Sequence, residues 1–165
     1  MDEREILNFW PGRCFGCSQT NSQGLQLHFW RSEQGCFTRC IIPDYLCSFE
    51  GLVHGGIIAC LLDEVAAWTI IARLARVGVT REMSIRYMKA VPANTELLIE
   101  GEIISHDERN AVLHSTVRTA DGALRAEGKS EWMLPRLSNI ANMAGVEETT
   151  LLQFLAKCSQ KVSSK

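Results

Sequence analysis

Apolar segments separated by turn residues predict two groups of β-strands, one on each side of a long apolar stretch in the middle of the chain. Residues 24–31 and 35–42 predict two strands, joined by a polar turn at residues 32–34. After Gly78, apolar runs alternate with turn residues of the kind that connect antiparallel strands, and Asp121–Gly122 is the strongest of these connections. This half of the chain therefore predicts four more strands, at residues 80–89, 95–105, 110–119 and 123–134.

One long helix is predicted between the two groups of strands, at residues 54–76. Short peripheral helices are predicted at 3–10, which Pro11 and Gly12 end, and at 147–162. A long helix followed by consecutive strands, with no βαβ alternation, indicates an α+β fold in which a curved antiparallel sheet of about five to six strands wraps around the helix. The 165 residues are expected to form a single domain, with its core at about 14–134.

The predicted central helix carries two acidic residues, Asp63 and Glu64, among apolar neighbours. A buried carboxylate lowers stability unless it is paired, hydrogen-bonded or open to a cleft. Asp63 shares its side of the helix with mostly small residues: Gly56, Ala59, Cys60, Ala66, Ala67 and Ile70. The bulky side is expected to pack on the sheet: Ile58, Leu61, Val65 and Trp68. The small side would then let a ligand or another backbone approach Asp63.

His54, Gly55 and Gly56 stand where this helix is expected to begin. Unbonded amide groups and the positive end of the helix dipole meet at such a position, and glycine lets a reacting group come close to the backbone. The arrangement suits a carbonyl oxygen that becomes negative during a reaction. Simpler explanations stay open, because the glycines can form a tight bend, the histidine can cap the helix, and Asp63 can pair with an arginine such as Arg86.

Charge and composition exclude several classes of partner. The chain has 17 basic and 19 acidic residues, and its net charge of −2 gives no reason to expect nucleic acid or an anionic membrane as a partner. No apolar run approaches the roughly 18 residues of a membrane-spanning helix, and the N-terminus lacks the layout of a secretory signal. A cytoplasmic protein with a small-molecule substrate is expected.

Seven cysteines, most of them in apolar segments, predict reduced and buried thiols. Cys14, Cys17, Cys36 and Cys40 have a spacing that superficially indicates zinc. However, two residues four positions apart on a strand lie about 13 Å from each other and cannot share one ion. No metal is therefore expected, and redox exchange between Cys14 and Cys17 is kept as an alternative.

The segment GLVHGGIIACLLDEVAAW (51–68) resembles the signature of the hotdog-fold acyl-CoA thioesterases, and in particular the branch typified by the phenylacetyl-CoA thioesterase. Three other stretches agree with that branch: CFGCSQTNSQGLQLHFW, VTREMSIRYMKAVP and ADGALRAEGKSEWML. The resemblance covers about residues 14–134. It implies a hotdog fold, a homodimer or a homotetramer built as a dimer of dimers, and hydrolysis of acyl-CoA thioesters, with no cofactor besides the CoA of the substrate.

The resemblance also implies catalytic roles for four residues. Asp63 would be the general base or the nucleophile, and the backbone amide of Gly55 would polarise the thioester carbonyl. His54 would shape that site through hydrogen bonds. Thr80, reaching over from the second subunit, would orient the water or the acid.

Gly56, Ser48 and Glu64 are expected at the substrate. Related proteins often carry Asn or Gln before the motif histidine, where this chain has Cys47–Ser48, so an amide is absent. Two other functions stay open: a non-catalytic module that binds acyl thioesters, and an enoyl-thioester hydratase. The hydratase would need an aspartate paired with a histidine, for which the candidates are His54, His106 and His114.

Overall fold

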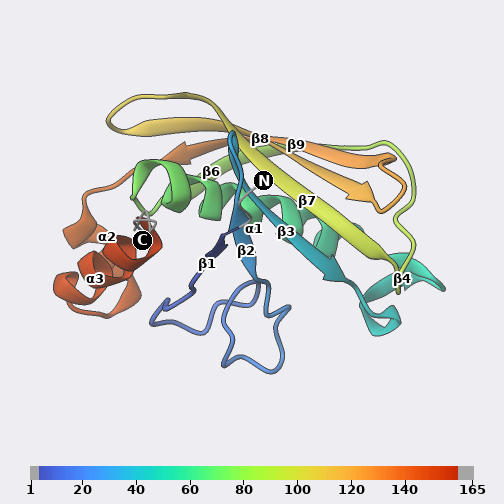
Figure 1. The fold of residues 1–165 in the computed structure, drawn as a ribbon, viewed down its shortest axis with the longest axis horizontal. Helices are drawn as coiled ribbons and strands as arrows, with labels where there is room; N and C mark the ends of the chain where they lie inside the picture. The colour runs from blue at the N-terminus through green and yellow to red at the C-terminus, as the bar shows by residue number, and fades with distance from the viewer. Residues whose placement is uncertain (1–3, 160–165) are drawn as a thin grey trace.

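The computed structural model describes residues 4–159, and it places one long helix, α1 (Gly55–Leu74), against the concave face of an antiparallel sheet (Figure 1). The strands lie side by side in the order β1-β2-β3-β7-β8-β9-β6. Their bounds are Glu5–Ile6 (β1), Phe29–Arg31 (β2), Gly35–Ile41 (β3), Val79–Tyr87 (β6), Glu96–His106 (β7), Asn110–Thr119 (β8) and Leu124–Met133 (β9). The predicted α+β architecture is confirmed, and β1 extends the six predicted strands to a sheet of seven.

The N-terminal part differs from its prediction. The helix predicted at residues 3–10 is wrong, because residues 5 and 6 instead pair with β2 at the sheet edge. The strand predicted at 24–31 keeps only its last three residues. Its first half is held by the preceding loop, where the amide of Leu25 donates to the carbonyl oxygen of Phe15 at 2.7 Å.

Four elements of the later chain have no counterpart in the prediction: a 3-10 turn, two short strands and helix α2. A 3-10 turn, Asp44–Leu46, leads into a small hairpin of β4 (Cys47–Phe49) and β5 (Leu52–Val53) just before α1. Helix α2 (Leu137–Ala144) precedes α3 (Glu148–Ser159), and the two pack together at one end of the molecule (Figure 1). The predicted C-terminal helix is confirmed up to Ser159, and its last residues lie outside the described chain.

The bulky side of α1 packs on the sheet as predicted. Trp68 is buried and stacks on Phe29 of β2, with ring centroids 4.9 Å apart. The expectation that the whole small side stays accessible is only partly met. Ala66 and Ile70 are fully buried in a second cluster with β8 and β9, so the accessible part of this side lies around Ala59, Cys60 and Asp63.

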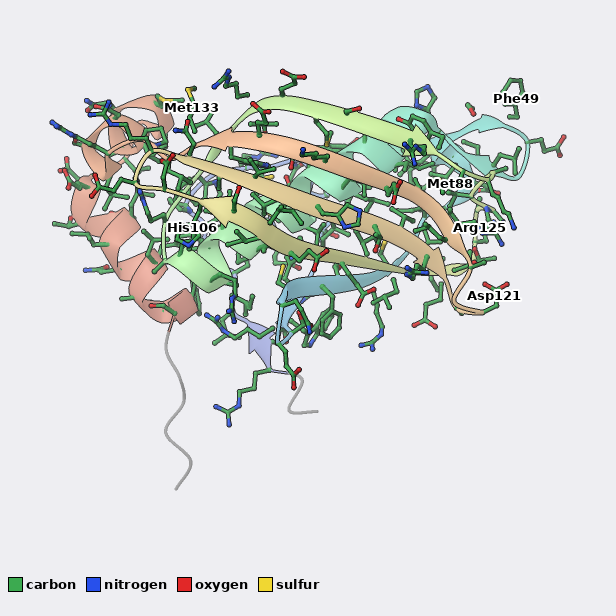
Figure 2. The ribbon with its side chains drawn as sticks, turned by 90° about the horizontal axis from the view of Figure 1, so that it is seen from above. Phe49, Met88, His106, Asp121, Arg125 and Met133 are labelled. Atoms are coloured by element: carbon green, nitrogen blue, oxygen red, sulfur yellow. The ribbon has the colours of Figure 1, made fainter. Side chains whose placement is uncertain are left out.

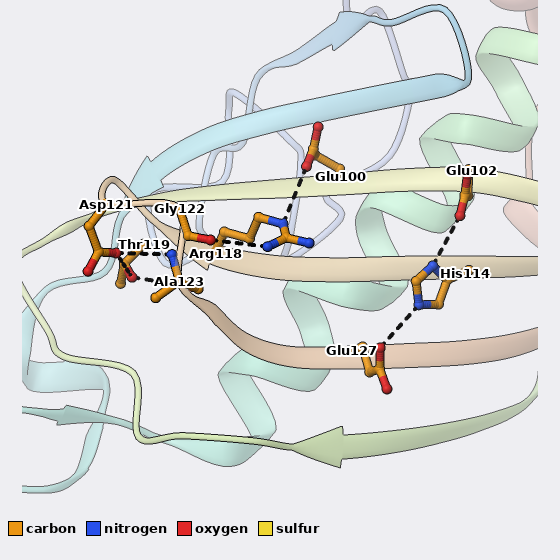
Figure 3. Close-up of polar contacts among 9 residues, drawn as sticks. All are labelled: Glu100, Glu102, His114, Arg118, Thr119, Asp121, Gly122, Ala123 and Glu127. Atoms are coloured by element: carbon orange, nitrogen blue, oxygen red, sulfur yellow. Dashed lines mark hydrogen bonds and ion pairs between the residues drawn. The ribbon is translucent and has the colours of Figure 1, made fainter.

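The convex face of the sheet carries the polar side chains, as Figure 2 shows from above. On this face His114 of β8 lies between Glu102 of β7 and Glu127 of β9, with nitrogen–oxygen distances of 3.2 and 3.5 Å (Figure 3). Exposed pairs of this kind contribute less than about 1 kcal/mol each. Within residues 4–159, no helix combines the length and the apolar character that crossing a bilayer requires.

The helix lies close to the sheet at Gly101 of β7. A Cβ atom there would lie 2.5 Å from the Thr69 hydroxyl oxygen and 3.0 Å from the main-chain oxygen of Val65, both on α1. We therefore expect Gly101→Ala to overpack this contact and to lower the free energy of unfolding by about 1–3 kcal/mol. Urea denaturation measures the change. Gly128→Ala is the matched control, because its Cβ would meet only ordinary contacts, the nearest at 3.4 Å. Equal stability of the two variants would contradict this account of the packing.

Candidate active site

Asp63 projects from the third turn of α1 and is only partly buried. The hydroxyl of Thr80, at the start of β6, donates a hydrogen bond to Asp63 Oδ1 at 2.7 Å. Burial raises the pKa of the Asp63 carboxyl above its usual value, and the bond from Thr80 lowers it in part. The possible ion pair with Arg86 is not formed, because this arginine contacts Glu127 at 3.2 Å. Asp63 is thus a carboxylate held by one hydroxyl, and among residues 4–159 no cationic side chain is recorded beside it.

The route by which Thr80 reaches Asp63 differs from the expectation. The resemblance implied a hydroxyl supplied by the second subunit, whereas the structure brings the two side chains together within one chain. The reason is the short connection at residues 75–78, which turns the chain back so that β6 follows directly after α1. The structure thus places Thr80 beside Asp63 of its own chain, and its catalytic role stays a prediction.

The first turn of α1 contains one unbonded donor. The peptide unit between Gly55 and Gly56 is bonded on both sides: its N–H donates to His54 Nδ1 at 2.8 Å, and its carbonyl oxygen accepts from the Tyr87 hydroxyl at 3.0 Å. The carbonyl of His54 accepts from the amides of Ile57 and Ile58. Within residues 4–159, no acceptor is recorded for the N–H of Gly55.

His54, Gly55 and Gly56, which the sequence pattern groups into one site, have different roles in this turn. His54 is the helix cap, and because its Nδ1 accepts a hydrogen bond, its proton lies on Nε2. The amide of Gly56, expected at the substrate, is occupied by that cap. Tyr87, at the end of β6, was not among the candidates, although it is the tyrosine of the quoted stretch VTREMSIRYMKAVP.

The two halves of the candidate site are far apart within one chain. Gly55 and Asp63 are eight residues apart on one helix, so they lie about 12 Å apart along its axis. An amide that binds a carbonyl oxygen and a carboxylate, or its water, that attacks the adjacent carbon must each lie about 3 Å from their targets. This separation of the two backbone positions favours a site that combines the amide of one chain with the carboxylate of another.

Ser48 and Glu64 have no recorded hydrogen bond with the Gly55 amide or the Asp63 carboxylate. Ser48 is exposed on the β4–β5 hairpin beside Phe49, which projects from the hairpin in Figure 2. Glu64 is rotated by about 100° from Asp63 around the helix, and it meets the N-terminal loop, where the Cys14 thiol donates to Glu64 Oε1 at 3.1 Å. Its expected place at the substrate is therefore not supported, and the contact with Cys14, 50 positions away, gave no local signal in the sequence.

All seven cysteines are free thiols. Cys36 lies in the core against Val65 and Thr69 of α1. It is not part of the group of possible metal ligands that contains Cys14. Cys14 and Cys17, by contrast, converge with Glu64, and their ligand atoms all lie within 4.8 Å of one another. Hydrogen bonds from the Cys17 thiol and from backbone amides lower the pKa of Cys14, whereas burial raises the pKa of Glu64.

The histidines outside the first turn of α1 do not pair with Asp63. His114 lies on the convex face between two glutamates (Figure 3), and His106 is exposed at the end of β7. His28 contacts Glu5 at 2.6 Å. The paired aspartate and histidine that a hydratase would need is thus not formed within the described chain.

Comparisons with known proteins agree with this fold. A family model described as the thioesterase superfamily matches residues 50–126. A crystal structure of a thioesterase superfamily protein is 25% identical, with a TM-score of 0.64, over 68% of this chain, and the match spans only 56% of that protein's length. No curated protein sequence gives a match.

Two streptococcal structures show the same fold at lower identity. A Streptococcus mutans protein bound to acetyl-CoA is 23% identical, with a TM-score of 0.61, over 66% of this chain and 88% of its own. A Streptococcus pneumoniae protein solved with coenzyme A and described as a hypothetical thioesterase is 22% identical, with a TM-score of 0.58, over 62% and 82%. The chain therefore has the hotdog fold, and over residues 50–126 it is similar to the thioesterase superfamily.

Proposed function

We propose that this protein hydrolyses acyl-CoA thioesters to a free acid and CoA, with active sites formed between two copies of the chain. The observation that carries the proposal is the partly buried Asp63 carboxylate, fixed by Thr80 on an accessible side of α1. Structural neighbours solved with coenzyme A and with acetyl-CoA support the class of substrate. The assignment to the phenylacetyl-CoA branch stays a prediction.

In this mechanism the ionised Asp63 either removes a proton from the attacking water or attacks the thioester carbon itself. The Thr80 hydroxyl donates a hydrogen bond to Oδ1 and fixes the orientation of the carboxylate. Oδ2 is then the oxygen that acts in the reaction. As the carbonyl carbon becomes tetrahedral, its oxygen gains negative charge, and the amide of Gly55 from the other copy stabilises it. The C–S bond then breaks, and CoA leaves as a thiolate. In the general-base route the thiolate takes up the proton that Asp63 removed from the water. In the nucleophilic route the thiolate is protonated from solvent, and water then hydrolyses the acyl–Asp63 anhydride to release the acid and restore the carboxylate.

The sheet offers a natural edge for the second copy. β6 is the terminal strand, and its outer edge has no partner within residues 4–159. A two-fold axis near Met83, the middle of β6, would pair two such strands antiparallel. The Thr80 end of one strand would then lie beside the Tyr87 end of the other, and Tyr87 is bonded to Gly55. This pairing brings together the two halves that one helix holds apart.

Replacing Asp63 by Asn should remove the base or nucleophile and keep the shape of the side chain. We expect kcat to fall about 10²–10⁴-fold, measured as release of free CoA thiol from a panel of acyl-CoAs. Retained binding of a non-hydrolysable CoA thioether would show that the site is still formed. If the parent protein bound acyl-CoA without releasing thiol, it would be a binding module instead of an enzyme.

Gly55→Pro tests the oxyanion donor, because proline removes only the N–H and is well tolerated at the first position of a helix. We expect kcat to fall about 10²–10³-fold. Gly55→Ala is the matched control: it keeps the N–H, and its Cβ would lie 3.7 Å from Tyr87, an ordinary contact. Its activity should stay close to that of the parent.

Mixing the two inactive variants tests whether the site is shared. A heterodimer of the Asp63→Asn and Gly55→Pro chains holds one intact site if each site combines Gly55 of one chain with Asp63 of the other. After co-expression and random pairing, about a quarter of the parent activity should return. No recovery, with heterodimers confirmed by native mass spectrometry, would refute a site shared between copies.

Removing the hydroxyl of Thr80 tests whether it positions the Asp63 carboxylate. Thr80→Val removes the bond to Asp63 at nearly constant volume, and losing a hydrogen bond to a charged group should lower kcat about 10- to 100-fold. Thr80→Ser should restore most of the activity. Equal rates for the valine and serine variants would show that the hydroxyl does not position the carboxylate.

A further inference from the structure

The proposed reaction leaves one cluster of reactive groups unused. The sulfur atoms of Cys14 and Cys17 and a carboxylate oxygen of Glu64 lie within 4.8 Å of one another, and Cys14 Sγ is 3.1 Å from Glu64 Oε1. They come from two parts of the chain, a loop before the first long strand and the middle of α1. Three potential anionic ligands therefore lie together here, and one of them, Glu64, directly follows Asp63 in the sequence.

Within residues 4–159, no lysine, arginine or histidine is recorded beside this cluster. The groups that act on the Glu64 carboxylate are the two thiols and Asp63. A carboxylate withdrawn from water is stable only when it is paired, hydrogen-bonded or protonated. A bound cation would satisfy the carboxylate and both sulfur atoms at once.

The backbone around the cluster is shaped for close approach. A Cβ atom on Gly16 would overlap with Cγ and Cδ of Glu64 in its present position, so the glycine between the two cysteines lets the loop lie directly against this side chain. The sulfur of Cys14 accepts hydrogen bonds from the backbone amides of Gly16 and Cys17. Such bonds to a ligand atom orient it before an ion binds, as outer-shell contacts do in metal sites.

The segment that carries the cysteines also needs an anchor. Residues 7–28 connect β1 to β2 without any helix or strand, and so long an irregular segment is uncommon in a compact domain. It contacts α1 through this cluster, and Asn8 Nδ2 donates to the Cys17 carbonyl oxygen at 2.6 Å. A cross-link between Cys14, Cys17 and Glu64 would fix the loop on the helix.

From this geometry we propose that Cys14, Cys17 and Glu64 bind one Zn²⁺ ion, with water as the fourth ligand. Two thiolates and a carboxylate suit zinc, whose bonds to sulfur and oxygen are about 2.3 and 2.0–2.2 Å long. The role is structural: the ion fastens the N-terminal loop to the turn of α1 that carries Asp63. The site could not be predicted from the sequence because its third ligand, Glu64, is remote from the cysteines. The set rejected there combined the same two cysteines with Cys36 and Cys40.

Metal analysis of the full-length protein tests the proposal. The protein is purified in a phosphine reductant without chelators, and its zinc is measured by mass spectrometry. We expect about one ion per chain. The chelated, reduced protein should take up one equivalent of ZnCl₂ in competition with a chromophoric chelator, and its melting temperature should rise with the zinc concentration.

Matched variants localise the ion. Cys14→Ser with Cys17→Ser should abolish stoichiometric zinc, and Glu64→Gln, which keeps the side-chain shape, should weaken binding at least 10-fold. Cys40→Ser is the control, because this cysteine lies on β3 outside the cluster, and it should bind zinc like the parent. Circular dichroism confirms that each variant is folded.

Three results would overturn the proposal: no zinc uptake by a protein with free thiols, equal zinc in the Cys14/Cys17 variant, or a Cys14–Cys17 disulfide in freshly prepared protein. The last would identify a dithiol pair instead of a metal site. These outcomes are separate from the proposed function. A zinc-loaded protein that hydrolyses no thioester would refute only the thioesterase, and an active enzyme that binds no zinc would refute only the metal site.

Discussion

The fixed rise of an α-helix is the constraint on which the proposed site depends. Because each residue advances about 1.5 Å, Gly55 and Asp63 stay about 12 Å apart however the side chains rotate. The helix is rigid here, since the sheet covers its bulky side and Thr80 holds Asp63 from β6. A chain built in this way holds two half-sites facing different neighbours. In the proposed mechanism the association of two copies completes the active site, so activity would depend on protein concentration.

The same geometry explains why two adjacent acids have different surroundings. A rotation of about 100° per residue turns Asp63 toward β6 and Glu64 toward the N-terminal loop. The two carboxyls share burial as the main cause of a raised pKa, but their partners differ: a hydroxyl for Asp63, and two thiols for Glu64. Neighbouring carboxyls in contrasting environments can divide their roles. In our interpretation Asp63 serves the reaction and Glu64 holds the loop that supports this turn of the helix.

The sequence predicted the parts of the fold that depend on local pattern. The long helix and five long strands follow from apolar periodicity and from turn residues such as Asp121–Gly122. Two-residue β1 was missed because its existence depends on pairing with β2, a contact 25 residues away in the register of Glu5 with Trp30. In the candidate site the motif located Asp63, Gly55 and Thr80. It could not show which chain supplies Thr80, nor that Glu64 meets Cys14, because both are tertiary contacts without a local signature.

Tyr87 and His54 give the tip of α1 its chemical character. An oxyanion donor is effective when it is oriented before the charge develops, so that no reorganisation is needed during the reaction. The peptide between Gly55 and Gly56 is held on both sides, by the Tyr87 hydroxyl and by His54 Nδ1. Holding this unit fixes the direction of the preceding amide, which is the one donor of the turn left without a recorded partner in the described chain. Because Tyr87 and Thr80 belong to the same strand, β6 orients the acid of one half-site and the amide of the other. The edge strand thus links both halves of the chemistry to the surface through which two copies would meet.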